Sequence, residues 1–327
     1  MEKAHRKSRD LKTFLWPVLV IFLFFIPSII ENQYTIHLLI VSGIYVILTV
    51  GLNLITGYIG SFSLGHAAFY GIGAYTSSIL SVNFGLSFWI TIWPAMIFAA
   101  FFGLILGIPC LRLRTSYLVI TTLAFGNIVY LLLVNLVGIT RGPLGIINIP
   151  PPTPINLGIF SLQFTTKPQY YYLVLFSVLL VLFFFKRFTD SRTGRAIISL
   201  REDDIAAEAI GVNVVYYKIL GFVIGSGMAG FAGALYAHYL RFVSPESFNI
   251  ITSITVLIMM IAGGVGNFYG PIIGAVGITF LLEKLRFLSD YRLIIYGLIL
   301  FLVIFLMPRG MMGLFKDIVR KRKKVAV

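Results

Sequence analysis

The chain has 327 residues, of which 58% are hydrophobic and only 12% are charged. An ordinary soluble domain carries about 25% charged residues, whereas this chain has no Asp, Glu, Lys or Arg between Tyr34 and Leu111. Lipid-facing side chains need no water, but a soluble surface cannot be built from so few charges. The composition therefore excludes an ordinary soluble protein and predicts an all-α polytopic membrane protein.

The formal net charge is +14, and basic residues gather at both ends of the chain, in residues 3–12 and 316–324. Basic residues that flank hydrophobic spans mark the cytoplasmic side and attract anionic lipid headgroups. We therefore expect membrane lipid, and no nucleic acid, as a partner of these ends. Cys110 is the single cysteine, which excludes an intramolecular disulfide, and no metal site is expected.

Hydrophobic spans follow one another along most of the chain. A transmembrane helix needs about 20 apolar residues. The segments that meet this condition, or nearly so, are 13–30, 36–55, 62–82, 88–110, 116–138, 170–185, 219–240, 250–282 and 293–307. Segment 250–282 is too long for one ordinary span.

The distribution of charge predicts the orientation. If the basic N-terminus is cytoplasmic, six spans return the chain to the cytoplasm at residue 186, and the loop 139–169 lies outside. A cytoplasmic C-terminus requires an even number of crossings, so segment 250–282 should form two spans or a re-entrant pair. We expect about ten hydrophobic segments, with a basic cytoplasmic N-terminus (1–12), a transmembrane domain (13–307) and a basic cytoplasmic C-terminus (308–327).

Two glycine-rich stretches should interrupt helices, because glycine and proline are poor helix formers. One runs from residue 51 to 75, and the other is AGGVGNFYGP at 262–271. Small residues also let helices pack closely in lipid, so close packing is the alternative reading. The candidate helix-breaking glycines are Gly57, Gly60, Gly65, Gly263, Gly264, Gly266 and Gly270.

Several kinds of chemistry are absent from the sequence. The predicted spans contain no Asp, Glu, Lys or Arg, although ion-coupled transporters usually need such groups. No catalytic motif and no phosphate-binding loop occurs, so no catalytic residue is expected. A pore of this kind is either a passive channel or is driven by another subunit.

The polar loop 186–218 carries five of the chain's twelve acidic residues. From Ile205 onward its apolar spacing predicts a short amphipathic helix that ends at Gly211. Such a helix suits docking into a groove on a partner, and a merely solvated loop is the alternative. The candidate coupling residues are Arg201, Glu202, Asp203, Asp204, Ala206, Ala207, Glu208 and Gly211.

The segment IAAEAIG, residues 205–211, resembles the coupling motif of the permeases of ATP-binding-cassette (ABC) importers. In that motif, the sequence Glu-Ala-Ala is followed by three residues of any kind and then by Gly. The chain matches the motif at Ala206, Ala207 and Gly211. It departs from the motif at Ile205, which replaces the usual Glu. Longer stretches, including LREDDIAAEAIGVNVVYYKILGFVIG and IAGGVGNFYGPIIGA, resemble the branched-chain amino-acid (LIV-type) branch, M-type subunit. The resemblance covers residues 36–315, and one departure is Asn127, where relatives often carry Glu.

The resemblance implies a five-part importer in the cytoplasmic (inner) membrane of a bacterium or archaeon. Its other parts would be a sister permease, two ATP-binding subunits and an extracytoplasmic substrate-binding protein. This chain would bind no cofactor, because ATP and Mg²⁺ would be used by the partner subunits. It would form the path for branched-chain amino acids.

Polar residues in otherwise apolar or glycine-rich spans are candidates for the translocation path: Asn53, Ser63, His66, Thr121, Asn127 and Asn267. Each could equally serve helix–helix contacts. The alternatives for the function are a urea or short-amide permease of the same family and a passive channel.

Overall fold

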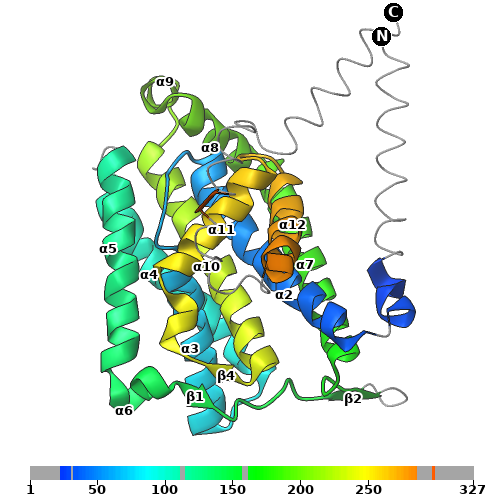
Figure 1. Cartoon of the computed structure of the whole chain (residues 1–327). Helices are drawn as coiled ribbons and strands as arrows, with labels where there is room; N and C mark the ends of the chain where they lie inside the picture. Colours follow the sequence, from blue (N-terminus) through cyan, green and yellow to red (C-terminus); the bar gives the residue numbers. More distant parts are fainter. Residues whose placement is uncertain (1–22, 31, 111–114, 157–160, 286–296, 299–327) are drawn as a thin grey trace, which may run out of the picture.

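The computed structural model describes residues 23–30, 32–110, 115–156, 161–285 and 297–298 (Figure 1). Helices dominate, and residues 23–29 form the first described turns. The remaining elements are α2 (Gln33–Leu52), the π-helix η1 (Asn53–Tyr58), α3 (His66–Phe84), α4 (Phe88–Cys110), α5 (Thr115–Asn135), α6 (Val137–Thr140), the 3₁₀ helix η2 (Gly142–Leu144), β1 (Ile146–Ile147), β2 (Ile155–Asn156), β3 (Ser161–Leu162), α7 (Lys167–Thr189), α8 (Arg192–Glu202), α9 (Asp204–Ala209), α10 (Val214–Leu240), β4 (Phe242–Val243), the 3₁₀ helix η3 (Pro245–Phe248), α11 (Ile250–Gly263) and α12 (Gly270–Lys284).

The predicted class, a helical polytopic membrane protein, is confirmed. Six helical stretches of the described chain are long and apolar enough to cross a membrane: Gln33–Tyr58, Phe88–Pro109, Tyr117–Asn135, Lys167–Thr189, Val214–Leu240 and Pro245–Gly263. Residues 13–22 of the first expected span, the whole of 293–307 except 297–298, and both basic ends lie outside the described residues. The number of ten segments and the placement of the termini stay predictions.

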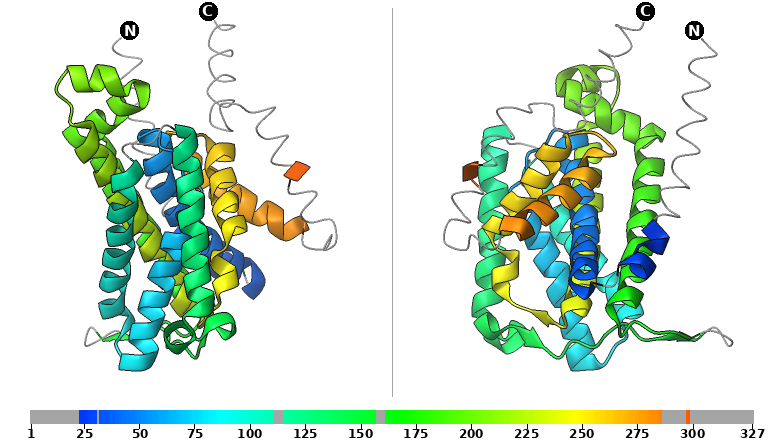
Figure 2. Two further views of the ribbon diagram at one scale, coloured as in Figure 1. Left: turned by 90° about the vertical axis from the view of Figure 1, so that its left-hand side faces the viewer. Right: turned by 45° about the vertical axis from the view of Figure 1, so that its right-hand side comes forward.

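The expectation of an all-helical chain misses four two-residue strands. Strand β1 pairs antiparallel with β4, with Ile146 opposite Val243, and β2 pairs antiparallel with β3. Their residues lie in the connections between helices, where two extended segments can satisfy each other's backbone groups. The strands and α6 gather at one end of the bundle, which we call the strand end, and α8 and α9 lie at the opposite end, the loop end (Figures 1 and 2).

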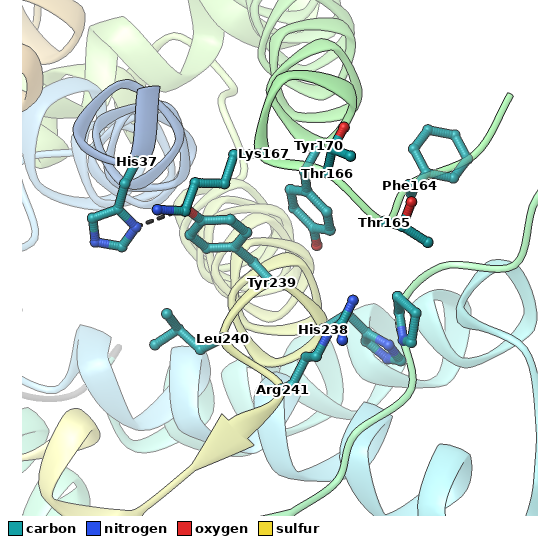
Figure 3. A pocket seen from close by; sticks show the side chains of 11 residues that line it. His37, Phe164, Thr165, Thr166, Lys167, Tyr170, His238, Tyr239, Leu240 and Arg241 are labelled. Atoms are coloured by element: carbon teal, nitrogen blue, oxygen red, sulfur yellow. Dashed lines mark hydrogen bonds between the residues drawn. The ribbon is translucent and has the colours of Figure 1, made fainter. Parts of the chain in front are cut away.

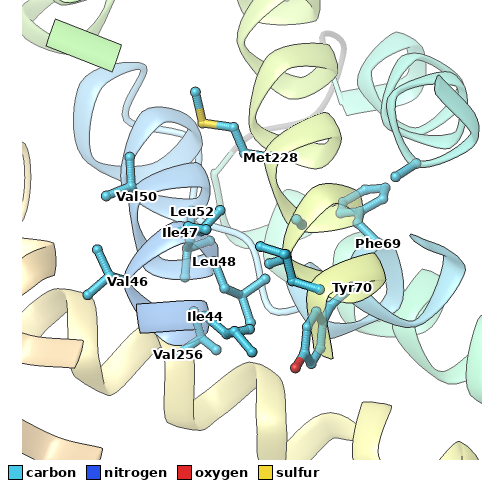
Figure 4. Packing of buried hydrophobic residues seen from close by; sticks show 14 of the residues in the cluster. Ile44, Val46, Ile47, Leu48, Val50, Leu52, Phe69, Tyr70, Met228 and Val256 are labelled. Atoms are coloured by element: carbon cyan, nitrogen blue, oxygen red, sulfur yellow. The ribbon is translucent and has the colours of Figure 1, made fainter. Parts of the chain in front are cut away.

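Helix α10 lies at the centre of the bundle and packs against α2, α3 and α4. Its glycines allow this close approach: a Cβ on Gly233 would lie 2.7 Å from the backbone N of Ala74 on α3, and a Cβ on Gly230 would lie 2.5 Å from the Ala99 Cβ on α4. Small residues let helix backbones approach in lipid, where the hydrophobic effect does not drive association. Large apolar side chains of α2, including Ile47 and Leu48, fill the neighbouring core (Figure 4).

Segment 250–282 forms two helices, not one. Helix α11 ends at Gly263, α12 begins at Gly270, and between them Gly264 and Gly266 have φ of 122° and 69°. The two helices, of 14 and 15 residues, are about 21 and 22 Å long at about 1.5 Å per residue.

Helix α12 runs antiparallel along α2. The hydroxyl of Tyr34, the second residue of α2, donates a hydrogen bond to Glu283 at the far end of α12. At the other end of α2, Asn53 hydrogen-bonds Asn267, just before α12 begins. The chain therefore turns back at the loop end of the bundle.

Candidate coupling region and translocation path

The predicted amphipathic helix of the polar loop is α9. Asp203 begins it, because its Oδ1 accepts hydrogen bonds from the backbone N–H groups of Ile205 (2.8 Å) and Ala206 (3.1 Å). Gly211, with φ +87°, follows its end in the left-handed conformation that favours glycine. Ala207 is buried on the inner side of the helix.

The outer side of α9 presents two large apolar side chains. Ile205 is 81% exposed and Ile210 is 77% exposed, and both lie at the loop end. A membrane-facing role does not account for them, since the helix projects beyond the long helices (Figure 1). An exposed apolar pair beside polar residues is typical of a site that a partner covers.

The acidic residues of the loop have different roles. Asp203 caps α9, and Asp204 forms an ion pair with Lys218 of α10. Glu202 and Glu208 are exposed, and within the described chain neither forms an ion pair. Two of the four acidic residues that were predicted to contact a partner thus stabilise the loop itself. Glu202 and Glu208 remain as acidic groups available to a partner.

Sequence reasoning missed α8, which precedes α9. Its N-cap is Ser191, whose Oγ accepts from the backbone N–H of Gly194 at 3.2 Å. Ile197 and Leu200 are buried, three residues apart, and they attach the helix to the bundle. The capping serine and this spacing were the signals in the sequence.

Arg201, in the last turn of α8, lies against both glycine-rich interruptions. Its Cα and side chain lie 3.6–3.9 Å from the place where a Cβ on Gly60 would sit. A Cβ on Gly266 would overlap its guanidinium group. Gly60 and Gly266 both have positive φ, 83° and 69°. One side chain of the polar loop therefore contacts two segments where helices are broken.

Asn53 connects η1, which precedes the first interruption, to residues 266 and 267 of the second interruption by hydrogen bonds inside the bundle. It is completely buried at the start of η1, its Nδ2 donates to the carbonyl of Asn267 (3.0 Å), and its Oδ1 accepts from the backbone N–H of Gly266 (2.9 Å). Gly57 leaves the necessary space, because a Cβ there would lie 2.6 Å from the Gly266 nitrogen. The buried amide satisfies backbone groups that the broken helix leaves without helical partners.

Of the path candidates, Asn53 and Asn267 are brought together, and Ser63 and His66 lie where α3 begins. The chain is not helical from Gly60 to Gly65, so α3 starts at His66, four residues later than the expected span. His66 is completely buried, and its Nε2 donates to the carbonyl of Leu48 at 3.0 Å. Its Nδ1 has no hydrogen-bond partner among the described residues. The bond to Leu48 ties the start of α3 to α2.

Thr121 and Asn127 lie apart from this group on α5. The Thr121 hydroxyl donates to Tyr117 of its own helix, and Asn127 is exposed. The neighbouring Thr122, which the sequence did not single out, is buried, and its Oγ1 accepts from the backbone N–H of Leu64 at 3.0 Å. It anchors α5 to the non-helical stretch before α3.

No group of three or more His, Cys, Asp or Glu side chains that could hold a metal occurs among the residues that the structure describes. The arrangement is one of packing, capping and hydrogen bonds between segments. Its chemistry suits a mechanical connection between the loop end and the interrupted helices.

Comparison with known proteins adds to this geometry. Residues 34–305 match the family described as branched-chain amino acid transport system / permease component. The chain is 37% identical over 296 residues to the high-affinity branched-chain amino acid transport system permease protein LivM of Escherichia coli (strain K12), covering 85% of this chain and 70% of that protein. It is 36% identical over 319 residues to LivM of Salmonella typhimurium, covering 92% and 75%.

A different permease protein of the same kind of system, LivH of Salmonella typhimurium, is 27% identical over 288 residues, covering 82% of this chain and 91% of that protein. No solved structure matches the chain. The matches confirm the resemblance seen in the motifs and the assignment of a transport subunit instead of an enzyme. The chain therefore belongs to the family of permease components of branched-chain amino acid transport systems.

Proposed function

We propose that this chain is a permease subunit of an ABC importer, that it forms part of the path for branched-chain amino acids, and that separate ATPase subunits drive it. The observation that carries this proposal is the connection from α9 through Arg201 to both broken segments. Force applied to α9 at the loop end would reach Gly60 and Gly266 through one side chain.

Docking of an ATPase on α9 would depend mainly on apolar contacts. Full burial of an isoleucine side chain stabilises a complex by about 1.5–3 kcal/mol before the costs of association. Ile205 and Ile210 are both available for such burial. Ile205 occupies the position where the motif usually has Glu, so an apolar contact would replace a polar one there. Glu202 and Glu208 would add charge complementarity at the rim.

Transmission would use contacts that differ between two states. A ligand or partner shifts a conformational equilibrium only through differential contacts. Movement of α8 relative to the bundle would alter the contacts of Arg201 with Gly60 and Gly266. Movement of residues 266 and 267 relative to η1 would alter their hydrogen bonds with Asn53. Domain and helix shifts of this kind are common in switching proteins.

The proposed orientation places the loop end in the cytoplasm and the strand end outside, with about ten hydrophobic segments and both termini cytoplasmic. The inner membrane of a bacterium or archaeon is the proposed location. The proposed partners are a sister permease, two ATPase subunits and an extracytoplasmic binding protein. The similarity to both LivM and LivH supports a permease pair.

The proposed cargo is leucine, isoleucine or valine. It is supported by the names of the relatives, which are branched-chain amino acid permeases, and by predicted spans that lack Asp, Glu, Lys and Arg. Uptake of labelled leucine, with unlabelled valine and urea as competitors, tests it. Competition by valine and not by urea is expected, and the reverse result would favour the amide alternative.

Docking through α9 is tested in the reconstituted importer with Ile210→Glu, because Ile205 stands where the motif usually has Glu and Ile210 does not. We expect the ATPase subunits to co-purify at less than about a tenth of the normal level, because a charge would have to be buried at the docking surface. Val215→Glu is the matched control, since Val215 is an apolar residue at the same end and is 51% exposed. Equal loss in both variants, or in neither, would contradict docking through α9.

Arg201→Ala distinguishes docking of the ATPase subunits from transmission of their movement to the interrupted helices. The ATPase subunits should still bind, but more ATP should be hydrolysed for each leucine imported. A normal ratio of leucine to ATP in this variant would remove Arg201 from the mechanism.

A further inference from the structure

A cavity of about 310 Å³ lies at the strand end, away from the coupling region (Figure 3). Its lining comes from four parts of the chain: α2, the connection after β1, the segment that leads into α7, and the end of α10. This volume is at the lower limit of small-molecule sites, which occupy about 300–1,000 Å³. Nothing in the coupling mechanism uses this cavity.

Two basic side chains line the cavity. They are Lys167, the first residue of α7, and Arg241, which follows α10. No acidic side chain lines the cavity, and within the described chain neither cation takes part in an ion pair. Lys167 Nζ donates to the carbonyl of Gln33 at 3.4 Å, and the guanidinium of Arg241 donates to no described residue. Among the residues that the structure describes, the positive charge of the cavity is therefore uncompensated.

The other polar groups of the cavity are already bonded within the protein. His37 Nδ1 is 2.7 Å from the Tyr239 hydroxyl. His238 Nδ1 donates to the carbonyl of Pro150 at 2.7 Å, so its Nε2 is left to accept from the Ser77 hydroxyl at 2.9 Å. The Tyr170 hydroxyl donates to the carbonyl of Leu235 at 2.7 Å. These bonds hold the walls in place and leave the two cations for a ligand.

The rest of the lining combines two threonines, Thr165 and Thr166, with the apolar residues Pro151, Phe164 and Leu240. Phe164 is 8% exposed, and its ring packs edge-on against Trp89 at 5.8 Å between centroids. Leu240, 37% exposed, lies on another side of the cavity. A ligand that fits must therefore combine one anionic group with a short apolar part.

We propose that this cavity binds a small aliphatic carboxylate, with the carboxylate between Lys167 and Arg241 and the hydrocarbon against Phe164 and Leu240. The inference rests on the proposed function in one respect: the physiological ligand is the amino acid that the importer carries, held at the strand end before it enters the path. Charge-assisted hydrogen bonds from Lys and Arg to a carboxylate are the stronger kind. Neither cation can bind an ammonium group, so the ammonium of an amino acid must point away from them.

The test uses the full-length chain with its sister permease in nanodiscs of phosphatidylcholine, without the binding protein. Three probes of similar size show which charged group of the ligand the cavity recognises. They are L-leucine, 4-methylpentanoate, which lacks the ammonium group, and 3-methylbutylamine, which lacks the carboxylate. Of the three tryptophans of this chain, Trp89 lies beside Phe164. Its fluorescence reports binding when Trp16, Trp93 and the tryptophans of the sister permease and of the nanodisc scaffold protein are replaced by Phe. We expect both carboxylates to bind, 4-methylpentanoate at least as tightly as leucine, and the amine not to bind.

Arg241→Gln should weaken carboxylate binding about tenfold. Arg141→Gln is a closely matched control, because Arg141 is also exposed, also follows a helix and has φ of 61° against 58° for Arg241, but does not line the cavity. Binding of the amine, absence of carboxylate binding, or equal weakening by both substitutions would overturn the proposal. Leucine uptake by the complete unmodified importer is measured in parallel, since it tests the proposed function independently of this cavity.

Discussion

Replacing Asn53 with alanine should both destabilise the permease and disturb coupling. The side chain is completely buried and makes two hydrogen bonds, to the carbonyl of Asn267 (3.0 Å) and from the N–H of Gly266 (2.9 Å). Alanine removes both bonds and leaves the two backbone groups without their partner.

The size of the effect follows from the two bonds. Hydrogen bonds between helices of membrane proteins contribute about 0.6 kcal/mol on average and up to about 1.7 kcal/mol. Two of them give about 1–3 kcal/mol. If they form in only one conformational state, their loss changes the balance between states about 5–150-fold.

Two measurements check this prediction: the apparent unfolding temperature in detergent, and the number of ATP molecules hydrolysed per leucine imported by the reconstituted importer. We expect the unfolding temperature to fall by about 2–6 °C and the ATP cost of import to rise. Asn135→Ala is the control, since Asn135 is an exposed asparagine on α5 whose amide donates, among the described residues, to the carbonyl of Leu131 of its own helix alone. If Asn53→Ala changes the unfolding temperature and the ATP cost no more than Asn135→Ala does, the buried amide of Asn53 does not connect η1 to residues 266 and 267.

Two further substitutions test backbone geometry. Gly73→Ala places a methyl group onto the backbone of Gly230 in α10, which should cost about 1–3 kcal/mol or more by overpacking. The yield of monodisperse protein in size-exclusion chromatography should therefore fall. Gly138→Ala, whose new methyl group would have no neighbour within 4 Å, should leave the yield unchanged, and equal yields of the two variants would disprove the close contact between α3 and α10. Gly211→Ala forces a Cβ into a left-handed conformation at a cost of about 1–2 kcal/mol without any steric neighbour, so hydrogen exchange in α9 should become faster. Gly211→Asn should be milder, and identical exchange in all three proteins would show that the left-handed turn does not hold α9.

The long helices were predictable because their composition sets their limits. The expected span 88–110 coincides with α4, since Gly85 ends α3 in a left-handed turn and charged residues follow residue 111. The break within 250–282 was equally visible, because glycine and proline cluster there. These features depend on residues close together in the sequence.

The interior of the coupling region was not predictable in the same way. Arg201 was expected to face a partner, but its guanidinium lies against Gly266, 65 positions later in the chain, and its backbone lies near Gly60, 141 positions earlier. Asp204 was expected to face a partner too, and it pairs with Lys218. Helix α8 was missed because only two of its large side chains are buried among many charges. Such contacts depend on tertiary packing between distant parts of the chain, and the local spacing of apolar residues does not reveal them.

The glycine contacts of α10 have a consequence for how the permease can change shape. A Cβ on Gly233 would meet α3 at 2.7 Å from the Ala74 nitrogen, and a Cβ on Gly103 of α4 would meet α10 at 2.9 Å from the carbonyl of Phe222. Backbones in such contact cannot slide or rotate past each other without collision, so α3, α4 and α10 must move as one rigid body. Within the part of the chain that the structure describes, the joints at residues 59–65 and 264–269 lie outside this frame, and substitutions that stiffen them should slow the cycle without unfolding the frame.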